Sequence, residues 1–175
     1  MKSIKKILIR TGYLLILLSF GCSQQHVEKQ VISEIYHGIE FEMPSVTEPV
    51  FPGYSVSITD FGAIGDGQIL NTEAFSKAIA NVSEKGGGQV IIPHGIWLTG
   101  PIILKSNINI HAKAGALVIF SKNKDLYPLI ESNFEGWKTV RCMSPIMGRN
   151  LENIALTGEG IFDGSGEVWR LVKRS

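Results

Sequence analysis

The chain has 175 residues, of which 44% are hydrophobic and 19% are charged, and its net charge is +1. This length predicts one domain or part of one, and the composition excludes a disordered chain. The two cysteines are too few for a disulfide-rich scaffold or a four-thiolate zinc site, and the charge gives no reason to expect a nucleic-acid partner. The 19 glycines exceed ordinary usage without the three-residue period of collagen, and therefore indicate many turns.

Residues 1–21 predict an export signal that is not part of the fold. A basic start with four cations precedes an uncharged apolar run at 13–20, which is too short to span a bilayer. The run ends in Ser19-Phe20-Gly21-Cys22, which resembles a bacterial lipobox, although Ser19 stands where the usual pattern has leucine. We therefore expect lipidation of Cys22 and an exported bacterial lipoprotein, anchored to a membrane in the periplasm or at the cell surface. The alternative is an ordinary secretory signal with a chance cysteine.

Residues 22–55 predict an extended tether. The segment begins with polar residues and contains three prolines that interrupt regular structure. His26 and His37 lie in it without a neighbouring cysteine or carboxylate at ligand spacing, so we interpret them as surface residues. Removal of residues 1–21 leaves 13 basic and 16 acidic residues, a net charge of −3.

One helix is predicted, between a short strand at 55–59 and a series of further strands. Residues 60–67 form a turn segment rich in Gly and Asp, with too few aspartates for a calcium loop. Asn71 or Thr72 is the expected helix start, and Gly86 is the expected left-handed residue at its end. The side chains of the helix that fall on one apolar stripe are Ala74, Phe75, Ala78, Ile79 and Val82.

From Gln89 onward, short apolar runs alternate with turn residues, as in an all-β protein. The predicted strands cover residues 89–92, 96–99, 101–104, 108–111 and 116–120. A weak repeat relates residues 107–110 to residues 153–156, and we interpret its offset of 46 as two coils of about 23 residues in a parallel β-helix. Two unrelated strands of a β-sandwich are the alternative.

Several strings together resemble glycoside hydrolase family 28, the polygalacturonase family of the pectate-lyase-like superfamily. They lie at 58–67, 71–75, 86–93, 99–107 and 153–164, and the resemblance covers residues 56–170. Thr99-Gly100-Pro101-Ile102 and Thr157-Gly158-Glu159-Gly160 are the more family-specific strings. The resemblance implies an all-β fold, a right-handed single-stranded parallel β-helix that begins at residue 56 and is truncated at 175. It also implies that the helix covers the N-terminal end.

The same resemblance implies hydrolysis of α-1,4 bonds between galacturonic acid units of pectin, by inverting acid/base catalysis without a cofactor. In this family, the catalytic aspartates lie in an Asn-Thr-Asp motif and an Asp-Asp pair, with an Arg-Ile-Lys motif further on. None of these three strings occurs here, so no catalytic residue is carried over, and we expect this chain alone to be inactive. The alternatives are a non-catalytic carbohydrate-binding surface protein, a rhamnogalacturonan hydrolase or a pectate lyase.

Asp163 is the carboxylate that most invites a catalytic interpretation, but it is not part of an Asp-Asp pair and its motif matches a turn. Lys138, Arg141 and Arg149 are interpreted as solvated surface charges, with binding of an anionic sugar as the alternative.

The remaining aromatic, imidazole and thiol side chains receive structural interpretations. Trp97 is expected in the core, whereas Trp137 and Trp169 are expected in loops, where they are possible sugar platforms. Two histidines, His94 and His111, are expected to be structural or exposed, and Cys142 is expected to be a small packed residue.

Overall fold

The computed structural model describes residues 38–41 and 48–170. The chain divides into two compact units, Met1–Thr47 and Glu48–Ser175. The predicted export signal, Cys22, His26 and His37 lie outside the described residues. None of the helices in the described part is long and apolar enough to cross a membrane.

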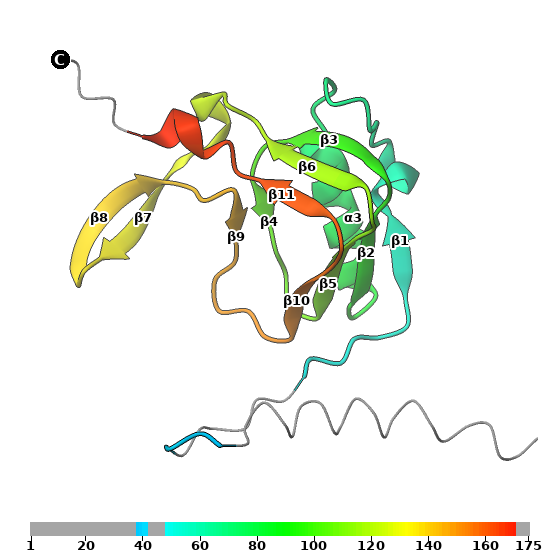
Figure 1. Ribbon diagram of the computed structural model, residues 1–175, viewed down its shortest axis with the longest axis horizontal. Coiled ribbons are helices and arrows are strands. Elements are labelled where there is room, and N and C mark those ends of the chain that lie inside the picture. Colours follow the sequence, from blue (N-terminus) through cyan, green and yellow to red (C-terminus); the bar gives the residue numbers. More distant parts are fainter. Residues whose placement is uncertain (1–37, 42–47, 171–175) are drawn as a thin grey trace, which may run out of the picture. The chain divides into compact units, whose positions relative to one another are not determined.

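The second unit is a solenoid of short parallel strands (Figure 1). The four-stranded sheet has the order β1 (Ser55–Ser57), β2 (Gly88–Ile92), β5 (Ile108–Ala112) and β10 (Ile154–Gly158). A three-stranded sheet contains β3 (Gly95–Thr99), β6 (Ala116–Phe120) and β11 (Ile161–Asp163), and a two-stranded sheet contains β4 (Ile102–Ile103) and β9 (Ile146–Met147). From β2 to β6, and again from β9 to β11, successive strands along the chain belong to different sheets. Each of these strands pairs in parallel with the equivalent strand of the neighbouring coil. This arrangement is a right-handed parallel β-helix, as the resemblance to family 28 implied.

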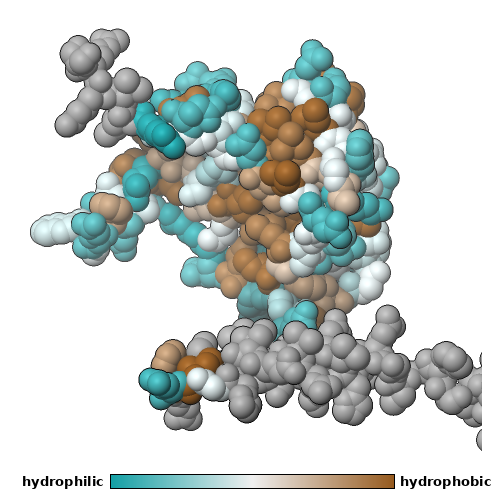
Figure 2. Space-filling model, in the orientation of Figure 1, coloured by the Kyte–Doolittle hydropathy of each residue, from teal (hydrophilic) through white to brown (hydrophobic). Residues whose placement is uncertain are grey.

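The strand register places equivalent apolar side chains above one another in the interior. Val90 pairs with Ile110, which pairs with Leu156. Val90 and Ile110 are fully buried, whereas Leu156 on the last described coil is 48% exposed. Figure 2 shows hydrophobic surface gathered around β10 and β11, where Ile154, Leu156 and Ile161 are exposed. The stacking of coils therefore buries what a single coil leaves open to water.

The interpretation of the 46-residue repeat as two coils was wrong. Ile108 pairs directly with Ile154, so the 46 residues between them make one coil. The preceding coil pairs Gly88 with Ile108 and advances only 20 residues. The longer coil contains an antiparallel hairpin of β7 (Leu129–Phe134) and β8 (Trp137–Cys142), inserted between β6 and β9. No regular structure was predicted from the sequence in that segment.

The hairpin has a two-residue turn and projects away from the solenoid (Figure 1). The turn residues Glu135 and Gly136 have φ values of 51° and 86°. Positive φ at both central positions gives the primed turn whose twist matches that of paired strands. A short 3-10 helix, η2 (Lys124–Leu126), leads into the hairpin.

The predicted strand at 55–59 is shorter than expected because a capping interaction ends it. The Asp60 carboxylate accepts from the Ser57 amide at 2.9 Å, and the Ser57 hydroxyl accepts from the Thr59 amide at 3.3 Å. These bonds start the 3-10 helix η1 (Ile58–Phe61), which ends at the left-handed Gly62.

Helix α3 (Thr72–Glu84) buries the predicted apolar stripe against the first coil. The stripe residues join the same core cluster as Ile58, Val90, Ile92 and Trp97. Gly86 follows the helix with φ 88°, as predicted. The apolar face of α3 therefore covers the solenoid interior at this end, which agrees with the expected role of the helix.

Asn71 occupies the position before α3 but does not cap the helix with its side chain. Its amide group instead donates to the carbonyls of Ile64, Ile69 and Leu98, and its Oδ1 accepts from the Ile64 amide at 2.7 Å. Asn71 is 2% exposed. This one side chain thus fixes the loop before α3 against the end of β3, a long-range role that helix-start patterns do not reveal.

Candidate functional site

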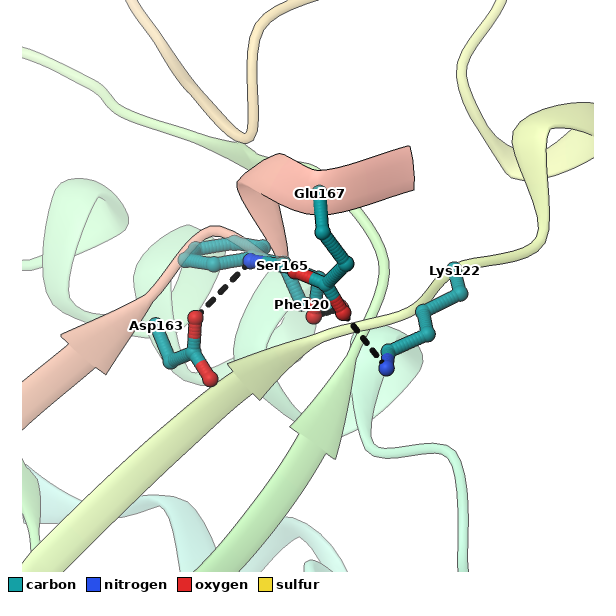
Figure 3. Close-up of polar contacts among 5 residues, drawn as sticks. All are labelled: Phe120, Lys122, Asp163, Ser165 and Glu167. Atoms are coloured by element: carbon teal, nitrogen blue, oxygen red, sulfur yellow. Dashed lines mark hydrogen bonds and ion pairs between the residues drawn. The ribbon is translucent and has the colours of Figure 1, made fainter. Parts of the chain in front are cut away.

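Asp163 has a structural role at the corner that follows β11 (Figure 3). Its Oδ1 accepts from the Ser165 amide at 2.9 Å. Ser165 adopts a left-handed conformation with φ 49° and is 1% exposed, and its hydroxyl donates to the Phe120 carbonyl at 2.9 Å. The carboxylate of Asp163 therefore stabilises the turn between β11 and the 3-10 helix η3 (Gly166–Trp169).

An ion pair lies beside this corner. Lys122 Nζ is 2.6 Å from Glu167 Oε1, and both side chains are exposed (Figure 3). The hydrogen bond and the charge of Glu167 raise the pKa of Lys122, and the hydrogen bond from Lys122 lowers the pKa of Glu167. The pair holds η3 against the segment that follows β6, so it is part of the same structural corner.

Lys138 and Arg149 line a cavity of about 520 Å³ on one side of the hairpin. The Arg149 guanidinium donates to the Glu131 carbonyl and so connects the residues after β9 to β7. The other lining residues are Glu131, Ser132, Asn133, Thr139 and Val140. The structure therefore brings two of the three predicted cations to one cavity, which the acidic residue Glu131 also lines.

Arg141 lies at a second cavity, of about 500 Å³, at the base of the hairpin. We call it the hairpin-base cavity, and it is lined by Arg141, Cys142, Met143, Ser144, Pro145 and Trp169. The Arg141 guanidinium carbon is 4.7 Å from the centroid of the Phe134 ring, at cation–π distance. None of the six lining residues is acidic.

Trp169 is held in position by two neighbours. Its ring meets that of Tyr127 edge to face, with 4.9 Å between centroids and 82° between planes. Lys124 Nζ lies 5.9 Å from the Trp169 centroid. Tyr127 is itself buried and donates to the Ser121 carbonyl at 2.8 Å, and burial raises its pKa.

The structure separates the three tryptophans into different roles. Trp97 is 3% exposed and donates from Nε1 to the Pro93 carbonyl at 2.8 Å, which confirms its place in the core. Trp137 and Trp169 are not in loops, because they belong to β8 and η3. Trp137 is 80% exposed at the hairpin tip. The hairpin therefore presents the Trp137 side chain to solvent, from a strand end and not from a loop.

His94 is exposed beside Gly115, and the partly exposed His111 contacts Thr157 through Nδ1 at 2.9 Å. The prediction for these two histidines is confirmed. The prediction for Cys142 was wrong, because the thiol is exposed at the edge of the sheet formed by the hairpin. Within residues 38–41 and 48–170, no group of three or more His, Cys, Asp or Glu side chains is arranged to hold a metal ion.

By fold, the chain belongs to the class of parallel β-helix proteins. No family model matches it. It is 37% identical over 125 residues to a probable polygalacturonase of Vitis vinifera, covering 66% of this chain and 26% of that protein. It also resembles two solved structures. A hyperthermoactive exopolygalacturonase from Thermotoga maritima has a TM-score of 0.65 and 38% identity, covering 78% of this chain and 29% of that one.

The second structure is a family 28 exopolygalacturonase from Yersinia enterocolitica, with a TM-score of 0.60 and 35% identity, covering 65% of this chain and 21% of that one. The resemblance to glycoside hydrolase family 28 that the sequence motifs indicated is thereby confirmed. The chain spans between about a fifth and a third of the length of these relatives.

Proposed function

We propose that the protein containing this chain is a pectin-degrading hydrolase that cleaves α-1,4 bonds between galacturonic acid units. The observation that supports this most strongly is the combined match in sequence and fold to polygalacturonases, at 35% to 38% identity. An inverting mechanism needs an acid and a base on opposite sides of the scissile bond, with room for water between them. Asp163 is engaged in its turn, and we assign neither role to a residue of this chain.

The test is the release of reducing ends from polygalacturonate by the full-length protein. We expect hydrolysis without products that absorb in the ultraviolet, because a lyase leaves an unsaturated sugar and a hydrolase does not. No release from a protein with intact β-sheet circular dichroism would contradict the proposal. Ultraviolet-absorbing products would indicate lyase chemistry instead. We expect residues 22–175 alone to be inactive, and measurable turnover by that segment would overturn the expectation.

A second candidate is a carbohydrate-binding surface protein without catalysis. The hairpin favours it, because exposed aromatic and cationic side chains such as Trp137 and Arg141 suit sugar binding without any carboxylate pair. Saturable binding of oligogalacturonate by the full-length protein without any hydrolysis would favour this candidate.

We further propose that Cys22 carries a lipid anchor after export. The support is the position of this cysteine after a short apolar run and one small residue, Gly21. A Cys22→Ser variant is expected to leave the membrane fraction for the soluble fraction. Unchanged membrane partitioning would contradict the anchor and leave the hydrolase proposal intact.

A further inference from the structure

The hairpin-base cavity combines side chains that suit a carboxylated sugar. The residues that line it include Arg141, Trp169 and Ser144. An arginine presents a planar fork of donors that matches a carboxylate, and indole rings contact the apolar faces of sugars. The volume of about 500 Å³ lies within the range of small-molecule sites, about 300–1,000 Å³.

Charge distinguishes this cavity from the one on the hairpin's side. The side cavity includes the acidic residue Glu131, and its Arg149 already donates to the Glu131 carbonyl. No acidic residue is among the described residues that line the hairpin-base cavity, and Lys124 near the Trp169 ring adds a second positive charge to its surroundings. Electrostatic complementarity to an anion therefore favours the hairpin-base cavity.

Arg141 is placed to bind a ligand because its guanidinium donors have no partner among the residues that the structure describes. Within residues 38–41 and 48–170, its guanidinium makes no hydrogen bond or ion pair, and its contact is with the face of the Phe134 ring. Stacking on the ring limits the rotamers of a long side chain and leaves its edge N–H groups available. The loss of side-chain entropy on binding a carboxylate is therefore reduced.

We propose that the hairpin-base cavity binds one galacturonate unit, with the Arg141 guanidinium pairing with the sugar carboxylate and the Trp169 ring contacting the sugar. The choice of galacturonate rests on the proposed function. The inserted hairpin thus contributes a substrate-binding position that lies outside the stacked coils of the solenoid.

The first test is titration calorimetry of the full-length protein with trigalacturonate, and with neutral galactotriose as the uncharged comparison. We expect trigalacturonate to bind and galactotriose to bind much more weakly. Arg141→Gln is expected to weaken trigalacturonate binding by about 10-fold or more, as for loss of a charge-assisted hydrogen bond. The affinity of Arg141→Lys for trigalacturonate should lie between those of the unmodified protein and Arg141→Gln, because an ammonium is a point charge without the planar fork. The control Lys113→Gln removes an exposed cation from the turn between β5 and β6 and should leave affinity unchanged.

The second test uses the exposed Cys142 thiol as a local probe, since it lines the same cavity. Trigalacturonate should slow alkylation of Cys142 by iodoacetamide, measured by peptide mass spectrometry, and galactotriose should not. Unchanged affinity in folded Arg141→Gln, absence of trigalacturonate binding by the unmodified protein, or unprotected Cys142 at saturating trigalacturonate would each overturn the inference. If Arg141-dependent binding occurs without hydrolysis, the inference holds and the hydrolase proposal fails. If polygalacturonate is hydrolysed but Arg141→Gln binds trigalacturonate normally, the hydrolase proposal holds and the inference fails.

Discussion

Asn153 donates from Nδ2 to Oδ1 of Asn107 at 3.1 Å, across a sequence separation of 46 residues. Both residues adopt the left-handed conformation, with φ values of 53° and 62°. They precede β10 and β5, so equivalent corners of two neighbouring coils are joined through their side chains. The chain therefore returns to the same corner after the hairpin, with the same residue type and the same backbone conformation.

Substitutions of Asn153 separate the contribution of its side-chain hydrogen bonds from that of its left-handed backbone conformation. Asn153→Gly keeps the left-handed conformation without strain but loses the bonds to Asn107 and to the Val50 carbonyl. Asn153→Ala loses those bonds and also strains the backbone, which costs about 1–2 kcal/mol per residue. We therefore expect Asn153→Ala to lower the free energy of unfolding by about 1 kcal/mol more than Asn153→Gly. Urea denaturation measures both, and equal losses would show that the left-handed conformation carries no cost here.

Gly158 should not tolerate a side chain. It has φ 94°, and a Cβ atom there would lie 2.0 Å from the Ala112 carbonyl oxygen. Since both strain and overlap follow, we expect Gly158→Ala to destabilise the fold by about 1–3 kcal/mol or more. Gly164→Ala is the matched control, because its Cβ would have no atom within 4 Å. Thermal denaturation should show a lowered midpoint only for Gly158→Ala, and similar midpoints for both variants would refute the steric argument.

Asn71 should be one of the most sensitive polar positions. Asn71→Ala leaves the Ile64, Ile69 and Leu98 carbonyls without this partner, and an unsatisfied buried group costs about 1–3 kcal/mol. Asn71→Asp is expected to be worse at neutral pH, because a carboxylate would face three carbonyl oxygens.

The exposed Asn123, whose side chain accepts from the Asp125 amide, gives the control variant Asn123→Ala. We expect Asn123→Ala to lower the free energy of unfolding by only about 1 kcal/mol or less. Chemical denaturation curves compare the three variants. If Asn71→Asp were as stable as the unmodified protein, the assignment of its Nδ2 and Oδ1 positions would be wrong.

Replacement by phenylalanine should lower the free energy of unfolding at Trp97 and leave it nearly unchanged at Trp137. Trp97→Phe removes the bond to the Pro93 carbonyl and leaves part of a buried site empty, for a loss of about 1–3 kcal/mol. Trp137→Phe changes a side chain that is 80% exposed and should alter stability by less than about 0.5 kcal/mol. Intrinsic fluorescence during unfolding gives the stability of each variant. A large loss of stability in Trp137→Phe would contradict the exposure of this side chain at the hairpin tip.

The Lys122–Glu167 pair should make the stability of the fold depend on pH, and this dependence should weaken as salt is added. The pKa of Glu167 lies below its ordinary value of 4.5 because Lys122 donates to the carboxylate. Its stabilising contribution is therefore fully present above the unfolded-state pKa and is lost as pH falls through the lowered folded-state pKa.

NMR titration of the Glu167 carboxyl should show this lowered pKa, and Lys122→Met should return it toward 4.5. The control Lys113→Met should leave the Glu167 pKa unchanged, and added salt should reduce the shift because both partners are exposed. A Glu167 pKa that does not respond to Lys122→Met would mean that the ion pair does not persist in solution.

The individual elements of the solenoid could be predicted from the sequence because their signals are local, whereas the β-helix itself was implied by the resemblance to family 28. The apolar stripe of α3, the short strands and the glycine and asparagine corners each follow from a few neighbouring residues. The length of one coil could not be predicted in this way. It depends on pairing between Ile108 and Ile154, and the hairpin between them lengthens that coil without altering the pattern at either end.

Much of the candidate site escaped prediction for a similar reason. The sequence shows the cationic residue Arg141 and the aromatic residue Trp169, but only the fold places them at one cavity. A local signal for the hairpin did exist, since Glu135-Gly136 stands between two segments that can alternate across a sheet. Cys142 was misassigned because a small thiol in an edge strand is not distinguished by composition from one in the core.

The hairpin also has an evolutionary consequence. It leaves the solenoid after β6 and the chain re-enters at β9, which pairs in parallel with β4 in the preceding coil. The pairing of β5 with β10 keeps its register across this excursion. A longer, shorter or different hairpin between β6 and β9 is therefore compatible with the same strand pairing between the coils. The hairpin, and with it the proposed galacturonate position, can therefore diverge among descendants of one ancestral solenoid while the strand pairing of the coils is kept.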